Sequence, residues 1–250
     1  MRHFRLLAAC ALSSFMFAPL AHAQQGQPMT TTSPATAQSL TFERVFASPS
    51  LNGAAPRAVK LSPDGRYLTL LRNRADDRER YDLWGVDRQS GEWKMLVDSL
   101  KLSSGRELSE AEKMQRERQR IGDLKGIVSY EWAADGKSVL VPVDGDLLIA
   151  GLDGSVRKIE GAKGGELNPK LGPKGEHIAF VRDRRLWTGK VAGGEPVAIT
   201  PEEANENVHW GEAEFVAQEE MARFNGFWWS PDESRIAVER FDESMVGVVT

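Results

Sequence analysis

The chain has 250 residues, of which 41% are hydrophobic and 27% are charged, and its formal net charge at pH 7 is −4. These proportions are typical of globular proteins, and they exclude a disordered or collagen-like chain. Because the chain is mildly acidic and has no long basic run, we expect no nucleic-acid partner.

The first 23 residues have the pattern of a secretory signal peptide. Arg2 and Arg5 form a basic start, residues 6–20 are apolar, and Ala21-His22-Ala23 fits a cleavage site. A transmembrane anchor is disfavoured because the apolar run is shorter than the ~20 residues that a spanning helix needs. We therefore expect an exported protein, periplasmic or secreted, with no membrane span after cleavage.

Cleavage after Ala23 would also remove Cys10, the only cysteine of the chain. A lipid-attachment box ending at Cys10 is the alternative, but the stretch between Arg5 and Cys10 is too short for an apolar region of ~7–15 residues. The mature protein is therefore expected to have no disulfide, and we predict no cofactor and no metal. Residues 24–40 are uncharged and rich in Gln, Thr, Ser and Pro, which indicates a flexible linker before a domain at 41–250.

One turn signature recurs four times after this linker. In each copy, a short turn of Pro or Ala, Asp or Lys, and Gly or Glu separates two apolar runs. Proline sets φ for the first central position of a β-turn and glycine accepts the tight exit, so the flanking runs are expected to be strands. The four copies are Leu61–Leu68, Trp132–Val139, Leu171–Ile178 and Trp229–Ile236.

The spacing of these turns predicts an all-β fold, a β-propeller of four-stranded blades with short helical insertions. Each turn is followed by further hairpins, which gives four short strands in about 40 residues, the size of one blade. We predict blades at about 57–98, 127–160 and 168–200, and a fourth from Gly226 that reaches about its third strand at Thr250. A β-sandwich is the alternative, but four returns of one turn favour the propeller. Since propellers close with ~4–8 blades, about three and a half blades predict the N-terminal, truncated part of a larger protein.

Two longer connections interrupt the blades, and we call residues 103–125 the first insertion and residues 201–225 the second insertion. In the first insertion the sequence predicts a helix that Ser109 caps and Gly122 ends. In the second, the Ala, Gln, Glu and Met content of residues 214–221 favours a short helix. Because strands alternate in direction, both insertions are expected to leave the blades on one face and to meet there.

Charged residues of the two insertions are candidates for binding. Arg118 shares a helix face with Met114 and Ile121 and so points where the apolar side points; alternatively, its stem covers apolar surface and its head reaches water. Glu219 and Glu220 are adjacent acids, which are usually solvated. Facing a cavity, such a pair would bind an ammonium group strongly.

Residues 214–246, EFVAQEEMARFNGFWWSPDESRIAVERFDESMV, resemble the propeller domain of bacterial dipeptidyl peptidase IV, in the prolyl oligopeptidase group of serine peptidases. The signature is the Glu219-Glu220 pair followed by Trp-Trp-Ser-Pro-Asp at 228–232. The run Glu117–Trp132 is also similar to the bacterial branch, and the resemblance extends over 41–250.

The resemblance implies an eight-bladed propeller that caps an α/β-hydrolase domain. It implies that Glu219 and Glu220 bind the free N-terminal ammonium of a peptide and that an arginine contacts the substrate backbone. We assign that arginine to Arg118, with Arg116 as the second choice. The activity implied is removal of N-terminal dipeptides that have Pro or Ala second, and a homodimer of the full-length protein is compatible with it.

The catalytic half of that family is missing from the sequence. No Gly-x-Ser-x-Gly motif occurs, so the nucleophilic serine of that family is absent. His177 and His209 have no such serine to act on, and the chain alone is therefore expected to be inactive. A non-enzymatic periplasmic propeller that binds proteins is the alternative function. A hydrolase domain in the reading frame beyond Thr250 would favour the peptidase.

Overall fold

The computed structural model describes residues 40–47, 51 and 55–247. The predicted signal peptide and all but the last residue of the predicted linker lie outside these residues. The chain divides into two compact units, Met1–Phe46 and Ala47–Thr250. The described part of the first unit contains the short helix α1 (Phe42–Phe46). Among the described helices, none is long and apolar enough to cross a membrane.

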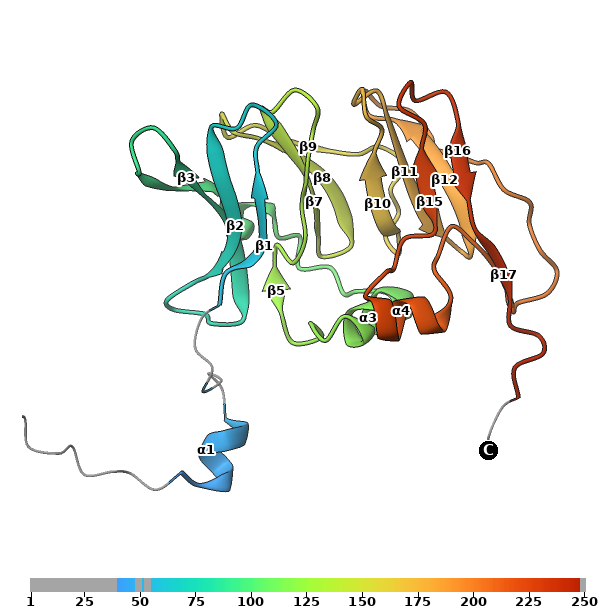
Figure 1. Ribbon diagram of the computed structural model, residues 1–250, viewed down its shortest axis with the longest axis horizontal. Coiled ribbons are helices and arrows are strands. Elements are labelled where there is room, and N and C mark those ends of the chain that lie inside the picture. Colours follow the sequence, from blue (N-terminus) through green and yellow to red (C-terminus); the bar gives the residue numbers. More distant parts are fainter. Residues whose placement is uncertain (1–39, 48–50, 52–54, 248–250) are drawn as a thin grey trace, which may run out of the picture. The chain divides into compact units, whose positions relative to one another are not determined.

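Three four-stranded antiparallel arrays form most of the second unit, as Figure 1 shows. Within each array the strands lie side by side in the order of the chain, which is the up-and-down arrangement of a propeller blade. The three blades predicted from the turn spacing are therefore confirmed. Their strands are β1 (Arg57–Leu61), β2 (Tyr67–Asn73), β3 (Arg80–Asp87) and β4 (Trp93–Val97); β6 (Glu131–Trp132), β7 (Ser138–Val143), β8 (Asp146–Gly151) and β9 (Val156–Lys158); and β10 (Leu167–Leu171), β11 (His177–Arg182), β12 (Arg185–Lys190) and β13 (Val197–Ala198).

The fourth blade contains the hairpin of β15 (Phe227–Trp229) and β16 (Ile236–Val238). The expected third strand, β17 (Arg240–Asp242), instead continues β16 and pairs with β14 (Val208–Trp210) of the second insertion. A single residue, Glu239, separates β16 from β17 and cannot reverse the chain. The blade therefore has its first two strands, in keeping with about three and a half blades.

The recurring turn has the same hydrogen bond in all four blades, and the residue that closes it has a positive φ between 62° and 76°. Glycine occupies that position three times, and Glu233 occupies it in the fourth blade. The buried Glu233 carboxylate accepts the N–H of Lys174 at 3.0 Å and of His177 at 2.7 Å, both in the neighbouring blade. These bonds tie two blades together and offset the conformational cost of a left-handed glutamate. The turn bonds are Gly65 N to Ser62 O, Gly136 N to Ala133 O, Gly175 N to Gly172 O and Glu233 N to Ser230 O.

Apolar cores lie between successive blades. On β7, Val139 and Val141 pack toward the first blade, whereas Leu140 packs toward the third, with Phe180. Successive side chains of a strand point to opposite faces, so both faces of β7 are buried. A third core joins the third and fourth blades around Leu186 and Phe227. Burial on both faces explains why the central strands are nearly continuous in apolar residues.

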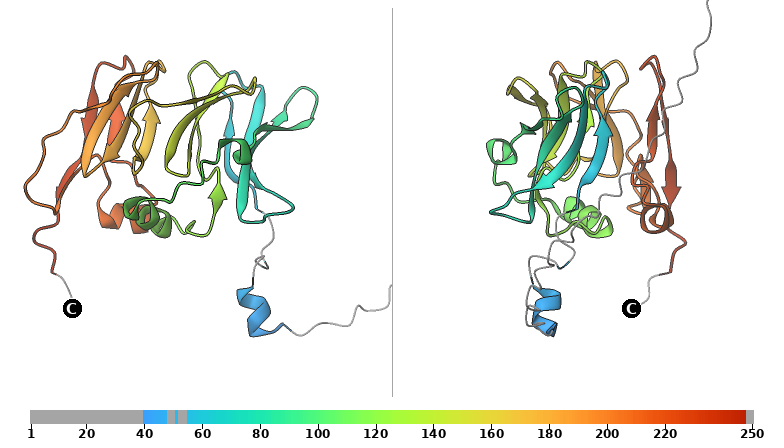
Figure 2. Two further views of the ribbon diagram at one scale, coloured as in Figure 1. Left: turned by 180° about the vertical axis from the view of Figure 1, so that it is seen from behind. Right: turned by 60° about the vertical axis from the view of Figure 1, so that its left-hand side comes forward.

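The helices α3 (Glu110–Arg118) and α4 (Phe215–Met221) of the two insertions lie at one end of the blades, as Figures 1 and 2 show. The first insertion contains α3 and β5 (Lys125–Gly126), and α2 (Ser99–Leu102) precedes it. Strand β5 pairs in parallel with β3, which the sequence did not predict. Gly126 has a φ of 72°, and a Cβ there would lie 2.6 Å from the carbonyl oxygen of Tyr81, so this close approach requires glycine.

Candidate functional site

Helix α3 begins as the sequence predicts, with Ser109 as its N-cap. The Ser109 hydroxyl accepts the N–H of Glu112 at 3.3 Å, and the Glu112 carboxylate accepts the N–H of Ser109 at 2.8 Å, which completes a capping box. The Glu112 side chain also lies 3.5 Å from the Arg106 guanidinium. The start of this helix is therefore fixed by reciprocal local bonds.

Substituting Ser109→Ala removes one half of this capping box. We expect a loss of about 1 kcal/mol in the free energy of unfolding, because one N–H of the first turn loses its acceptor. Urea denaturation of parent and variant measures the difference. An unchanged midpoint would show that the cap does not contribute to stability.

The predicted end of α3 at Gly122 is wrong, because the helix stops earlier. Gln119 is the C-cap and Arg120 takes the left-handed conformation, with a φ of 55°. The N–H of Ile121 bonds to the Arg116 carbonyl at 2.9 Å and the N–H of Arg120 to the Glu117 carbonyl at 2.8 Å. This is a Schellman motif, which closes the last turn without a glycine.

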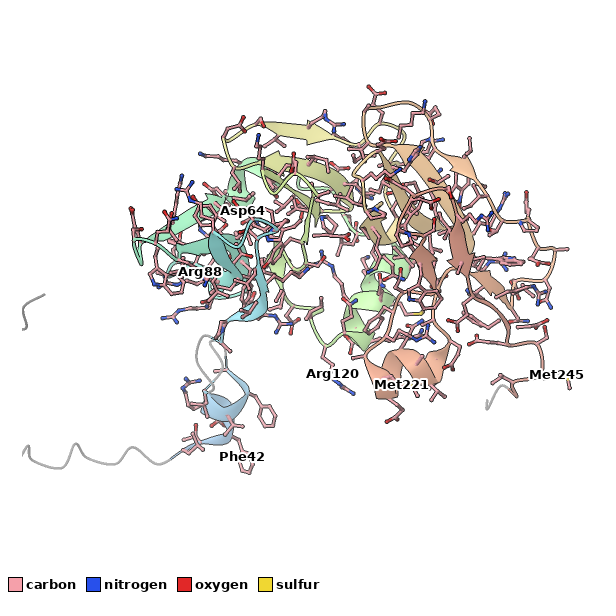
Figure 3. All side chains as sticks on the ribbon, turned by 45° about the horizontal axis from the view of Figure 1, so that its top comes forward. Phe42, Asp64, Arg88, Arg120, Met221 and Met245 are labelled. Carbon is pink, nitrogen blue, oxygen red and sulfur yellow. The ribbon has the colours of Figure 1, made fainter. Side chains whose placement is uncertain are left out.

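Helix α4 (Phe215–Met221) is the helix predicted in the second insertion, and its N-cap is Glu214. The two carboxylate oxygens of Glu214 accept the N–H groups of Val216 and Ala217, each at 2.7 Å. Ala222, with a φ of 50°, ends the helix. Figure 3 shows Met221 on the side of the molecule away from the strands.

The two insertions meet through Arg118, as strand counting predicts. Its Nη1 donates to Oε1 of Gln218 on α4 at 2.8 Å, and its guanidinium carbon lies 5.4 Å from the ring centroid of Phe215. The head of Arg118 is therefore held against α4, only one residue before Glu219-Glu220. The helix face that Arg118 shares with Met114 is not packed against a core, because Met114 is 59% exposed. The head of Arg118 bonds to α4 and does not simply extend into water.

Arg116, the second choice, turns to the other side of the first insertion. Its Nη1 donates to the carbonyl of Leu124 at 3.0 Å, and burial lowers the pKa of its guanidinium. This hydrogen bond closes the loop that follows α3. Of the two arginines, it is Arg118 that the structure places beside α4.

Glu219 is half-buried and Glu220 is exposed. Within the described part of the chain, neither carboxylate has a hydrogen bond or an ion pair. Both are therefore available as acceptors, and their position depends on the backbone of α4 alone.

A cavity of about 570 Å³ lies between the two insertions and the β11–β12 hairpin. Arg118, Phe215 and Gln218 form one wall, and Arg182 and Trp187 form another. Glu219 and Glu220 are not among its lining residues, so the structure does not bring the pair into this cavity. Gln218, which directly precedes Glu219, nevertheless lines the cavity.

Comparison with known proteins shows which family the chain resembles. Residues 132–250 match the family model described as "Dipeptidyl peptidase IV (DPP IV) N-terminal region". The crystal structure of Porphyromonas gingivalis dipeptidyl peptidase 4 superposes with a TM-score of 0.52 at 25% identity, covering 78% of this chain and 27% of that one. Residues 132–250 of this chain are therefore similar to the N-terminal region of the dipeptidyl peptidase IV family.

Curated dipeptidyl peptidases also match parts of this chain. Probable dipeptidyl-aminopeptidase B of Emericella nidulans is 40% identical over 75 residues, which cover 30% of this chain and 8% of that protein. Dipeptidyl peptidase 8 of Mus musculus is 28% identical over 192 residues, covering 63% of this chain and 20% of that protein. The chain thus spans a fifth or less of the length of these relatives.

The two histidines of the dipeptidyl peptidase IV-like propeller lie in contacts within and between blades. His177 Nδ1 is 3.4 Å from Oε1 of Glu233, and His209 Nδ1 is 3.4 Å from Oε1 of Glu212. His209 also stacks on Phe241 with ring centroids 4.8 Å apart. His209 also lines the cavity between the two insertions and the β11–β12 hairpin. No cluster of three or more His, Cys, Asp or Glu that could hold a metal occurs among the described residues.

Sequence reasoning missed Gln218 and Phe215 as contacts of Arg118. The two residues are three positions apart on α4, so they share one face of the helix. That spacing is a usable signal only when the partner helix is known.

Proposed function

We propose that this chain is the substrate-selecting portion of an exported serine dipeptidyl peptidase that removes N-terminal dipeptides with Pro or Ala second. The observation that carries the proposal is the contact between Arg118 and α4, the helix that carries Glu219 and Glu220. The signal pattern at 1–23 supports export.

The chemistry of the three groups suits the N-terminus of a peptide. An ammonium group has three donors, and two unpaired carboxylates offer it charge-assisted acceptors. A guanidinium has five N–H donors, so Arg118 keeps donors for a substrate carbonyl after it bonds to Gln218. Binding a charged terminus at a fixed distance from a nucleophile selects the bond that is cut, which makes an exopeptidase.

The experiment compares arginine variants in the full-length protein that carries this chain. In Arg118→Met, kcat/KM for a chromogenic Gly-Pro substrate should fall roughly tenfold to a hundredfold, because a hydrogen bond to a charged group is lost. Arg116→Met is the matched control, since it makes the same change on the same helix but on the side facing Leu124.

The outcomes are distinguishable. The parent should cleave the substrate with a free amine and cleave its N-acetylated form poorly. Arg116→Met should retain that preference even if it lowers thermal stability. Equal cleavage of both substrates by the parent would contradict the proposed function, and equal losses in the two variants would contradict the assignment of Arg118.

A further inference from the structure

Gln218 has a side chain that is fully engaged at both ends. The residue is 7% exposed. Its Nε2 donates to the carbonyl of Ala213 at 2.6 Å, and its Oε1 accepts from Arg118 Nη1 at 2.8 Å. An amide carries an acceptor and a donor group on one planar head. Here the donor faces the Ala213 carbonyl and the acceptor faces the Arg118 guanidinium. A carboxylate in this place would face the Ala213 carbonyl without a proton to donate.

These bonds hold the helix turn that carries the glutamate pair. A helix as short as α4 is unstable in isolation, because fixing the backbone of its first turn costs conformational entropy and gains few hydrogen bonds. The Glu214 cap holds its first turn, and Gln218 anchors the next. Glu219 and Glu220 follow immediately and have no side-chain bonds of their own among the described residues. Their backbone position is therefore set by Gln218 and by the αL cap at Ala222.

The same side chain also orients Arg118. The guanidinium lies against Phe215 and bonds to Gln218, and no other hydrogen bond of its head occurs in the part of the chain that the structure describes. Gln218 is neutral, so it fixes the direction of the guanidinium without cancelling its charge. One residue thus links the cation on α3 to the two anions on α4.

We propose that Gln218 is a positioning residue that sets the separation between Arg118 and the Glu219-Glu220 pair. The proposal rests on the proposed function, because it assigns the spacing of groups that would bind the peptide N-terminus. Peptides with a free amine should depend on this spacing, because their ammonium group and first carbonyl lie a fixed distance apart. N-acetylated peptides should not depend on it.

The test uses Gln218→Leu in the full-length protein, because leucine is apolar, fills similar space and removes both hydrogen bonds. For a Gly-Pro substrate, KM should rise roughly tenfold while kcat changes less, as expected when a bond to a charged group is lost. The low rate on the N-acetylated substrate should stay the same. Gln119→Leu, the same change at the end of α3, is the control and should match the parent.

A double-mutant cycle separates positioning from general stability. If Gln218 acts through Arg118, Gln218→Leu in an Arg118→Met background should add less than twofold to the loss, because contacting residues are not additive. Additive losses, an unchanged KM, or equal losses on free and acetylated substrates would overturn the positioning role. A parent that does not distinguish the two substrates would instead overturn the proposed function, on which this role rests.

Discussion

Under the proposed function, replacing Glu219 or Glu220 with glutamine in the full-length protein that carries this chain should lower kcat/KM for X-Pro substrates by roughly 30-fold to several thousand-fold. Removing one partner of a desolvated charge pair costs roughly 2–5 kcal/mol, and each ~1.4 kcal/mol is a factor of ten. Glutamine keeps the shape of glutamate but loses the charge that would bind the substrate ammonium. The measurement is steady-state kinetics on free and N-acetylated X-Pro substrates.

The acetylated substrate is the internal control, because it lacks the ammonium and should lose little further in either variant. Glu206→Gln makes the same change at an exposed position of the same insertion and should leave the kinetics unchanged. Misfolding is not expected to explain the loss, because neither side chain is buried or bonded among the described residues, and substitutions at such positions usually change stability by less than ~0.5 kcal/mol. Unchanged kinetics in both Glu219→Gln and Glu220→Gln would show that the pair is a solvated end of α4.

Breaking the buried ion pair between Arg182 and Glu166 should lower the free energy of unfolding by roughly 3–5 kcal/mol. The Glu166 side chain is 0% exposed and lies 3.1 Å from Arg182 Nη1. It also accepts the N–H of Lys163 at 2.8 Å and of Gly164 at 2.9 Å. In Glu166→Gln, the Arg182 guanidinium would stay buried over Trp187 without its counter-charge.

The matched control is Glu110→Gln, which removes the same charge from an exposed pair. Glu110 lies 2.9 Å from Lys113, but its side chain is 90% exposed, so solvent screens the attraction. We expect its urea midpoint to stay close to that of the parent. Similar midpoints for Glu166→Gln and Glu110→Gln would contradict the stabilising role assigned to the buried pair.

Much of the fold was predictable because its signals are local. The Pro or Ala, Asp or Lys, and Gly or Glu turns define where strands reverse, and the same hydrogen bond closes all four of them. The Ser109 cap depends on bonds within three residues. The Glu219-Glu220 pair and the following Trp-Trp-Ser-Pro run identified the family from one short segment, and the match over 132–250 confirms it.

Contacts between segments that are distant in the sequence could not be predicted from local sequence patterns. Arg118 and Gln218 are 100 positions apart, and their hydrogen bond depends on how the second and third blades pack between the two insertions. Helix periodicity placed Arg118 on the apolar side of α3, but it gave no reason to prefer a glutamine on α4 as its partner. Likewise, Arg116 differs from Arg118 because the chain after α3 folds back to present the Leu124 carbonyl.

The departures from expectation have the same physical origin. A local pattern specifies hydrogen bonds between near neighbours, so it predicted turns, strands and helix starts. Where a strand finds its partner depends on the surrounding sheets, and β17 therefore pairs with β14 of the second insertion. Glu233 can adopt a glycine-like φ of 62° because the neighbouring blade supplies two N–H donors to its carboxylate. Those donors come from a turn some 56–59 residues earlier in the chain, and packing of the blades is what brings them within reach.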